Sequence, residues 1–198
     1  MGRKGRRLAT GSRRSRRQDL CSGGSGGGGS MDASQVATLS LFLTLGPLVL
    51  ASYGLLYRGA AAGKDFWFGM SRQVQYVYYA FMLLAAVGLC TFTGAYCARP
   101  RPSKGLFRFG WVVPALFATL LLASAGWSVA VALTNQRWLV SGLLVVVALC
   151  SILLVAGAAE ADNATWYLVL GAVLFATCTV LNDGVGWNAN FLLKTMPS

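Results

Sequence analysis

Five long apolar runs dominate the hydrophobic pattern of the chain, and short polar connections separate them. Each run is long enough to cross the roughly 30 Å hydrocarbon core of a bilayer as a helix. The alternation typical of strands is absent from the sequence, and backbone that faces lipid must form its hydrogen bonds within a helix. The pattern therefore predicts an all-α, polytopic five-helix transmembrane bundle. The predicted spans are residues 36–57, 75–97, 111–133, 138–159 and 166–182, the last ending there or continuing to about residue 193.

The composition agrees with this interpretation. Hydrophobic residues make up 56% of the 198 residues and charged residues only 12%, against about 25% charged residues in a typical soluble domain. A soluble protein of this length could not bury so much apolar surface. We therefore expect an integral membrane protein whose first partner is the lipid bilayer.

Residues 1–30 differ from the rest of the chain. They hold eight Arg or Lys residues against one Asp, and residues 22–30 are all Gly or Ser. This composition predicts a disordered basic tail ahead of a five-span membrane domain over residues 31–198. Three interpretations stay open: a transit peptide for a mitochondrial or plastid membrane, a tail attracted to anionic lipid, and an extension or linker before a start at Met31. The basic tail favours an inside N-terminus, but without it the charges decide nothing.

The residue types exclude several kinds of chemistry. The chain has no histidine, which removes His-based triads and the common zinc sites. No Lys, Arg, Asp or Glu lies near the middle of a predicted span, which argues against proton pumps and ion-coupled transporters. The five cysteines form no CxxC pair and are predicted to pack as small apolar residues. We therefore expect no enzyme, no catalytic residues, no cofactor and no metal site. The tail lacks aromatic residues, which argues against nucleic-acid binding.

A few residues within the spans carry more specific expectations. The Gly46-Pro47 pair predicts a bend in the first span, either accommodated by neighbouring helices or opening a ligand cavity. Asp183 is either a cap near the end of the fifth span or a polar group at the mouth of a cavity. The Ser and Thr hydroxyls within the spans are expected to bond the backbone of their own helices. Trp111, Trp138 and Trp166 each open a span, as residues of an interfacial belt do.

Small residues four positions apart are a further pattern in the spans. We expect such pairs to let helices approach closely within the bundle, ahead of a role in a homodimer. The pairs are Gly94 with Ala98, Gly126 with Ala130, and Ala172 with Ala176.

Parts of the chain resemble the tryptophan-rich sensory protein family, also called the translocator protein (TspO/MBR) family. Lys64 and Trp67 keep a K-x-x-W spacing in the first loop, and Trp127-Ser128 resembles the tryptophan motif of the family's third helix. The fifth-helix motif of the family is similar to residues 166–168, 175–177 and 181–182 here, and its second-helix motif is loosely similar to residues 78–82.

This resemblance implies a cavity in the bundle that binds a flat hydrophobic molecule such as a porphyrin or a sterol. It implies that Trp67 lies in a loop over the cavity and that Tyr79, Trp127 and Asn182 face it. Asp183, by its own position near the end of the fifth span, joins them as a candidate ligand-binding residue. An apolar pocket with a few polar groups and aromatic faces suits such a ligand. The alternative is a structural or accessory subunit of a larger membrane complex, or a homodimer, with no ligand of its own.

Overall fold

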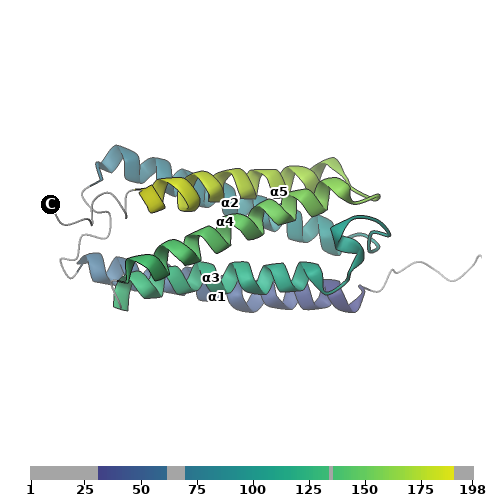
Figure 1. The fold of residues 1–198 in the computed structure, drawn as a ribbon, viewed down its shortest axis with the longest axis horizontal. Helices are drawn as coiled ribbons and strands as arrows, with labels where there is room; N and C mark the ends of the chain where they lie inside the picture. The colour runs from purple at the N-terminus through teal and green to yellow at the C-terminus, as the bar shows by residue number, and fades with distance from the viewer. Residues whose placement is uncertain (1–30, 62–69, 134–135, 190–198) are drawn as a thin grey trace, which may run out of the picture. The chain divides into compact units, whose positions relative to one another are not determined.

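The computed structural model of the protein describes residues 31–61, 70–133 and 136–189. The predictions for the tail and for Trp67 lie outside these residues. The helices, labelled in Figure 1, are α1 (Ala33–Ala61), α2 (Arg72–Cys97), α3 (Val112–Leu133), α4 (Arg137–Glu160) and α5 (Trp166–Thr179). A π-helix, η3 (Val180–Trp187), continues α5, and a 3₁₀ turn, η2 (Leu106–Arg108), precedes α3.

The prediction of an all-α five-helix bundle is confirmed. Five helices in the described residues are long and apolar enough to cross a membrane, the fifth being Trp166–Trp187. The fifth span therefore passes Asn182, because the chain widens into the π-helix η3 instead of ending there. At the start of the first span the helix begins at Ala33, three residues before the predicted boundary, because Asp32 provides an N-terminal cap.

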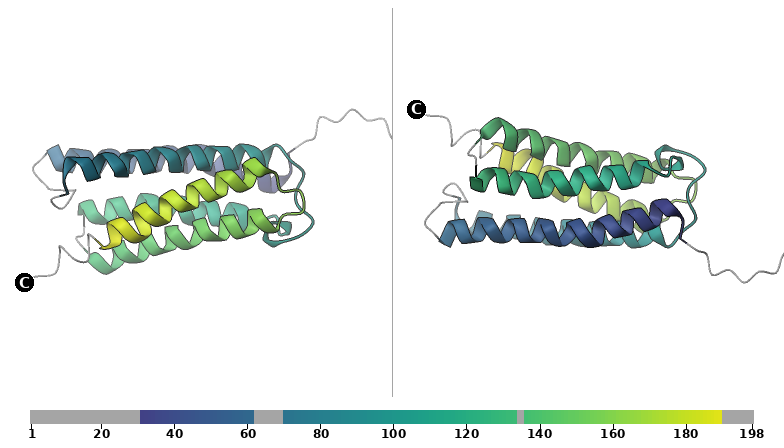
Figure 2. Two further views of the ribbon diagram at one scale, coloured as in Figure 1. Left: turned by 90° about the horizontal axis from the view of Figure 1, so that it is seen from above. Right: turned by 90° about the horizontal axis from the view of Figure 1, so that it is seen from below.

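The five helices run lengthwise beside one another, with successive helices antiparallel (Figures 1 and 2). The most extensive contacts join α2 to α5, α1 to α3, and α3 to α4, and α4 also packs on α5. Helices α1 and α2 follow each other in the chain, yet they share little contact. The bundle is therefore a nearly closed ring with a gap between α1 and α2.

Two glycines permit a close crossing of α2 and α5. A Cβ atom on Gly88 of α2 would lie 2.6 Å from the backbone nitrogen of Phe175, and one on Gly171 of α5 would lie 2.6 Å from that of Phe92. Both distances are too short for a real Cβ atom, so only glycine permits this approach. Lipid gives no hydrophobic drive for helix association, and close packing of this kind replaces it.

The predicted small-residue pairs have mixed outcomes. Ala172 and Ala176 are buried, as a packing role requires. The prediction is wrong for Gly94 and Ala98, which are exposed, and no atom lies within 4 Å of a Cβ on Gly94. Spacing alone did not reveal which face of the helix meets a neighbour.

Hydrogen bonds tie the start of α1 to the end of α2. The Asp32 carboxylate accepts the backbone N–H groups of Ser34 and Gln35 at 2.8 and 3.0 Å, and the Gln35 side-chain oxygen accepts the N–H of Asp32 at 2.9 Å. This reciprocal arrangement is a capping box. The Gln35 amide also donates to the carbonyl of Tyr96 at 2.9 Å and to that of Arg99, which satisfies the C-terminal end of α2.

The two loops at this end are bound to each other. Arg99 donates to the carbonyl of Asn163 at 3.2 Å and to the Tyr167 hydroxyl at 2.9 Å. The backbone N–H and hydroxyl of Ser103 both donate to Asp162. Together with the α1–α2 tie, these bonds close one end of the bundle.

Several of the predicted hydroxyls bond the backbone of their own helix, and of the described cysteines Cys150 and Cys178 are buried whereas Cys90 is exposed. Hydroxyls that bond a carbonyl of their own helix at 2.8 Å include those of Thr38, Thr44, Thr91, Thr93 and Ser128. Ser128 also donates to Ser52 at 2.7 Å, which adds a buried bond between α3 and α1. The cysteines at positions 90, 97, 150 and 178 are free thiols.

Candidate functional site

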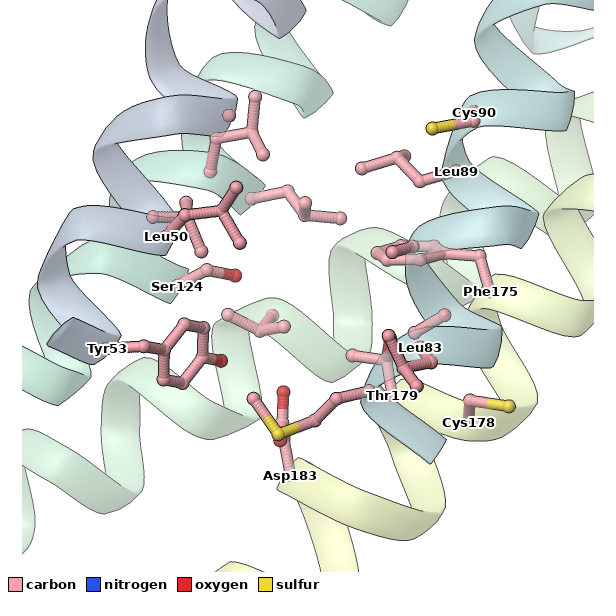
Figure 3. Close-up of a pocket in the computed structure, with 18 of the residues that line it drawn as sticks. Leu50, Tyr53, Leu83, Leu89, Cys90, Ser124, Phe175, Cys178, Thr179 and Asp183 are labelled. Atoms are coloured by element: carbon pink, nitrogen blue, oxygen red, sulfur yellow. The ribbon is translucent and has the colours of Figure 1, made fainter. Parts of the chain in front are cut away.

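A cavity of about 620 Å³ occupies the gap between α1 and α2. Figure 3 shows Leu50 and Tyr53 of α1 on one side and Leu83, Leu89 and Cys90 of α2 on the other. Helices α3 and α5 supply the inner wall, with Ser124, Phe175 and Thr179 among the lining residues. Apolar side chains make up most of this lining.

The rim of the cavity is exposed on the surface of the bundle. Leu50 is 72% exposed and Leu83 is 70% exposed, and both line the cavity. Apolar side chains exposed in the middle of a membrane span face lipid. The cavity therefore opens sideways, between α1 and α2, toward the hydrocarbon core of the bilayer.

Gly46 and Pro47 both line this cavity. Helix α1 continues through Pro47, and no atom lies within 4 Å of a Cβ on Gly46. Proline has no N–H to donate to the carbonyl four residues earlier, that of Leu43, which also lines the cavity. Both residues of the Gly-Pro pair therefore lie at the cavity wall, and the predicted bend stays a prediction.

Asn182 and Asp183 form the polar end of the cavity. Both are buried, with exposed fractions of 5% and 8%, and both line the cavity. Both residues lie in the π-helix η3, where these two consecutive side chains are buried. π-helical turns are frequent at functional sites. The Asn182 side-chain N–H donates to one Asp183 carboxylate oxygen at 2.9 Å. Figure 3 shows the Asp183 carboxyl group pointing toward the space beside Tyr53.

One acceptor at this polar end has no partner. The side-chain oxygen of Asn182 is buried and accepts no hydrogen bond within the described part of the chain. No described basic residue forms an ion pair with Asp183. Buried polar groups in proteins are nearly always hydrogen-bonded, so an unsatisfied acceptor at a cavity wall indicates a place where a ligand can bond.

An aromatic cluster lies behind the polar end. The rings of Tyr53 and Trp127 meet edge to face with centroids 5.8 Å apart, and those of Trp127 and Trp187 lie 5.5 Å apart. Tyr78 meets Trp187 edge to face at 5.8 Å. Trp127 is 1% exposed and packs against Tyr53, and Tyr53 lines the cavity.

The residues predicted for the site divide into three groups. Tyr79, Asn182 and Asp183 line the cavity together. Trp127 does not line it, because the ring of Tyr53 packs against it from the cavity side. Trp67 lies outside the described residues.

Several lining residues were missed from the sequence. Leu50 and Tyr53 of α1 and Met82 and Leu83 of α2 form much of the opening. They are ordinary apolar or aromatic residues within apolar spans, so residue type did not distinguish them. Within the first span, the Gly-Pro pair was the signal that pointed toward this side of the bundle.

Two carboxylates at the closed end of the bundle, those of Asp32 and Asp162, have lowered pKa values. Desolvation raises the pKa of Asp32, but hydrogen bonds from Ser34 and Gln35 and the nearby charge of Arg101 outweigh it, and the net pKa is lowered. The hydrogen bond from Ser103 lowers the pKa of Asp162. Both groups therefore stay ionised near neutral pH and hold the loops in place.

The three tryptophans that open spans lie on the surface. Trp111, Trp138 and Trp166 are 71%, 83% and 74% exposed. Trp111 immediately precedes α3, whereas Trp138 and Trp166 belong to the first turns of α4 and α5. Exposed tryptophans at span ends are typical of a membrane interface.

Comparison with known proteins finds no matching family model, no matching curated protein and no matching solved structure. The resemblance to tryptophan-rich sensory proteins stays a prediction.

Proposed function

We propose that the protein binds a planar hydrophobic ligand, of the sterol or porphyrin class, in the cavity between α1 and α2. The observation that carries this proposal is a 620 Å³ cavity with an apolar lining and two polar residues at one end. Binding sites for small molecules are concave and mostly apolar, with a few polar groups that fix orientation, and this volume lies within their usual range.

The side opening supports a ligand that arrives from the membrane. The exposed leucines at the rim place the entrance beside lipid tails. A molecule dissolved in the bilayer would reach the cavity without crossing water. This geometry agrees with either storage or transport of such a ligand.

A pair of alanines on α2 provides the test. Ala86 and Ala80 are both exposed, but only Ala86 lines the cavity. An Ala86→Phe substitution would add a ring at the cavity wall, whereas Ala80→Phe would add the same ring outside it. Purified protein in lipid nanodiscs is titrated with a fluorescent sterol and with protoporphyrin, and binding is read from fluorescence with empty nanodiscs subtracted.

We expect saturable binding of at least one ligand class to the unaltered protein and to the Ala80→Phe variant. The Ala86→Phe variant should bind at least about tenfold more weakly, a loss of about 1.4 kcal/mol. Equal binding by the two variants, or no saturable binding to any of the three proteins, would overturn the proposal. An accessory subunit without a ligand would then be the better account.

A further inference from the structure

The polar end of the cavity presents acceptors to a ligand. One N–H of the Asn182 amide donates to Asp183, and the amide oxygen, which faces away from that bond, accepts no hydrogen bond within the described residues. A flipped amide would place its oxygen against the carboxylate, so the hydrogen bond fixes this orientation. An ionised carboxylate can only accept. A donor group on a ligand can therefore bond to the free Asn182 oxygen and to an ionised Asp183 carboxylate.

The carboxylate also lacks a charge partner among the described residues. No described Lys or Arg pairs with Asp183, which is 8% exposed and surrounded by the apolar cavity lining. A charge in such surroundings is costly unless it is paired and hydrogen-bonded. Ionisable groups within membrane spans commonly pair with another group, and they mark the paths of substrates. A ligand group that pairs with Asp183 would therefore be a cation that donates hydrogen bonds.

The length and lining of the cavity indicate what shape of ligand fits it. On α1 the lining extends from Phe42 to Tyr53, which are eleven residues apart and so about 16 Å along the helix. The lining between these residues is apolar apart from backbone, and Asp183 lies at the Tyr53 end (Figure 3). The site thus fits a long apolar body with one polar head.

Resting on the proposed function, we infer that the cavity prefers a hydrophobic amine, an apolar molecule whose single ammonium head donates to Asn182 and Asp183. A neutral hydroxyl head can donate only one hydrogen bond and brings no charge. A carboxylate head, such as a porphyrin carries, would place a second negative charge beside Asp183. The order of affinity is therefore ammonium, then hydroxyl, then carboxylate.

Three probes with one ring system test this order. They are a 3β-hydroxysterol, the 3β-amine of the same sterol, and its 3β-hemisuccinate, which ends in a carboxylate. Each competes with a fluorescent sterol for the full chain in zwitterionic nanodiscs, and empty nanodiscs correct for partition into lipid. The comparison is made for the unaltered protein, for Asp183→Asn and for Asp162→Asn. The last variant is the control, because it removes the same charge from the loop at the closed end.

For the unaltered protein we expect the amine to bind at least about tenfold more tightly than the hydroxysterol, as for one additional desolvated charge pair. The hemisuccinate should bind more weakly than both. Asp183→Asn should bring the amine and hydroxysterol affinities to within about twofold while the hydroxysterol still binds. Asp162→Asn should retain the full preference.

Two results would overturn the inference while leaving the proposed function standing. One is equal binding of amine and hydroxysterol to the unaltered protein, a comparison that needs no variant to fold. The other is an amine preference that survives in Asp183→Asn. If none of the sterol probes binds, the inference fails; the proposed function fails with it only if the protoporphyrin titration also shows no saturable binding.

Discussion

Helix α2 has two very different sides. Against α5 it packs so closely that glycine is the only residue the crossing at Gly88 and Gly171 allows. Against α1 it makes little contact beyond the tied end, and the space between the two helices is the cavity. Both seams join apolar helices of similar composition, so hydrophobicity does not explain the difference.

Two glycines, one at each seam, show the same difference in packing. A Cβ atom added to Gly46 on α1 would meet nothing within 4 Å, whereas one added to Gly171 on α5 would lie 2.6 Å from the backbone of α2. In a membrane, apolar side chains gain little by leaving lipid for protein, and steric fit decides which helices join. The close fit joins α2 to α5, and the open seam between α1 and α2 contains the cavity.

The largest expected effect comes from enlarging a glycine in the closed seam. Gly171→Leu would force the side chain into the backbone of α2 at Phe92, where no side-chain rearrangement can relieve the clash. We expect a loss of about 3 kcal/mol in the free energy of unfolding. The measurement is thermal unfolding in detergent, followed by circular dichroism.

Gly142→Leu is the matched control, because Gly142 on α4 is exposed and has no atom within 4 Å of a Cβ. Its stability should stay within about 0.5 kcal/mol of the unaltered protein. Equal stability of the two variants would contradict the account of the α2–α5 crossing.

A smaller loss is expected from breaking the tie between α1 and α2. Gln35→Leu removes the amide that donates to the carbonyls of Tyr96 and Arg99, and it also removes the acceptor for the N–H of Asp32. Unsatisfied buried backbone groups should cost about 1–3 kcal/mol in the free energy of unfolding.

Thr44→Val is the corresponding control on α1, since the Thr44 hydroxyl is exposed and bonds only carbonyls of its own helix. It should change the unfolding temperature little. If Gln35→Leu is as stable as Thr44→Val, the hydrogen bonds at this end are not what holds α1 to α2.

The smallest effect concerns pH. The pKa of Asp32 in the folded protein lies below its usual value of about 3.9. Its contribution to stability is therefore fully present above that value and is lost as pH falls through the folded-state pKa. Because the group is partly solvated, we expect less than about 1 kcal/mol.

Asp32→Asn tests this pH effect, since asparagine is an equally good helix cap but does not titrate. Below about pH 4 the unfolding temperature of the unaltered protein should fall more steeply than that of the variant. Parallel pH profiles for the two proteins would show that Asp32 does not link acidity to the closed end.

The spans and their number could be predicted from the sequence because a run of apolar residues has one structural solution in lipid. The ends were less predictable: a cap at Asp32 and a π-helix after Thr179 moved them by several residues. Neither feature changes the apolar pattern, so neither is visible in it.

The site was predicted only in part. Asn182 and Asp183 stood out as polar residues near the end of an apolar span, and both line the cavity. Trp127 stood out for its residue type, yet it lies one layer behind Tyr53. Which aromatic residue faces the cavity depends on how far α1 stands from α2, and that distance follows from packing around the whole ring.

The most direct test of the central claim is to find where a bound sterol sits. A sterol carrying a diazirine on its tail is added to the full chain in nanodiscs, activated by light, and its attachment sites are mapped by peptide mass spectrometry. We predict that the labels fall on α1 between Phe42 and Tyr53 and on α2 between Tyr79 and Cys90, and that excess unlabelled sterol removes them. Labels spread evenly over exposed residues such as Leu149 and Ile152 of α4, unaffected by competition, would contradict the existence of a ligand site between α1 and α2.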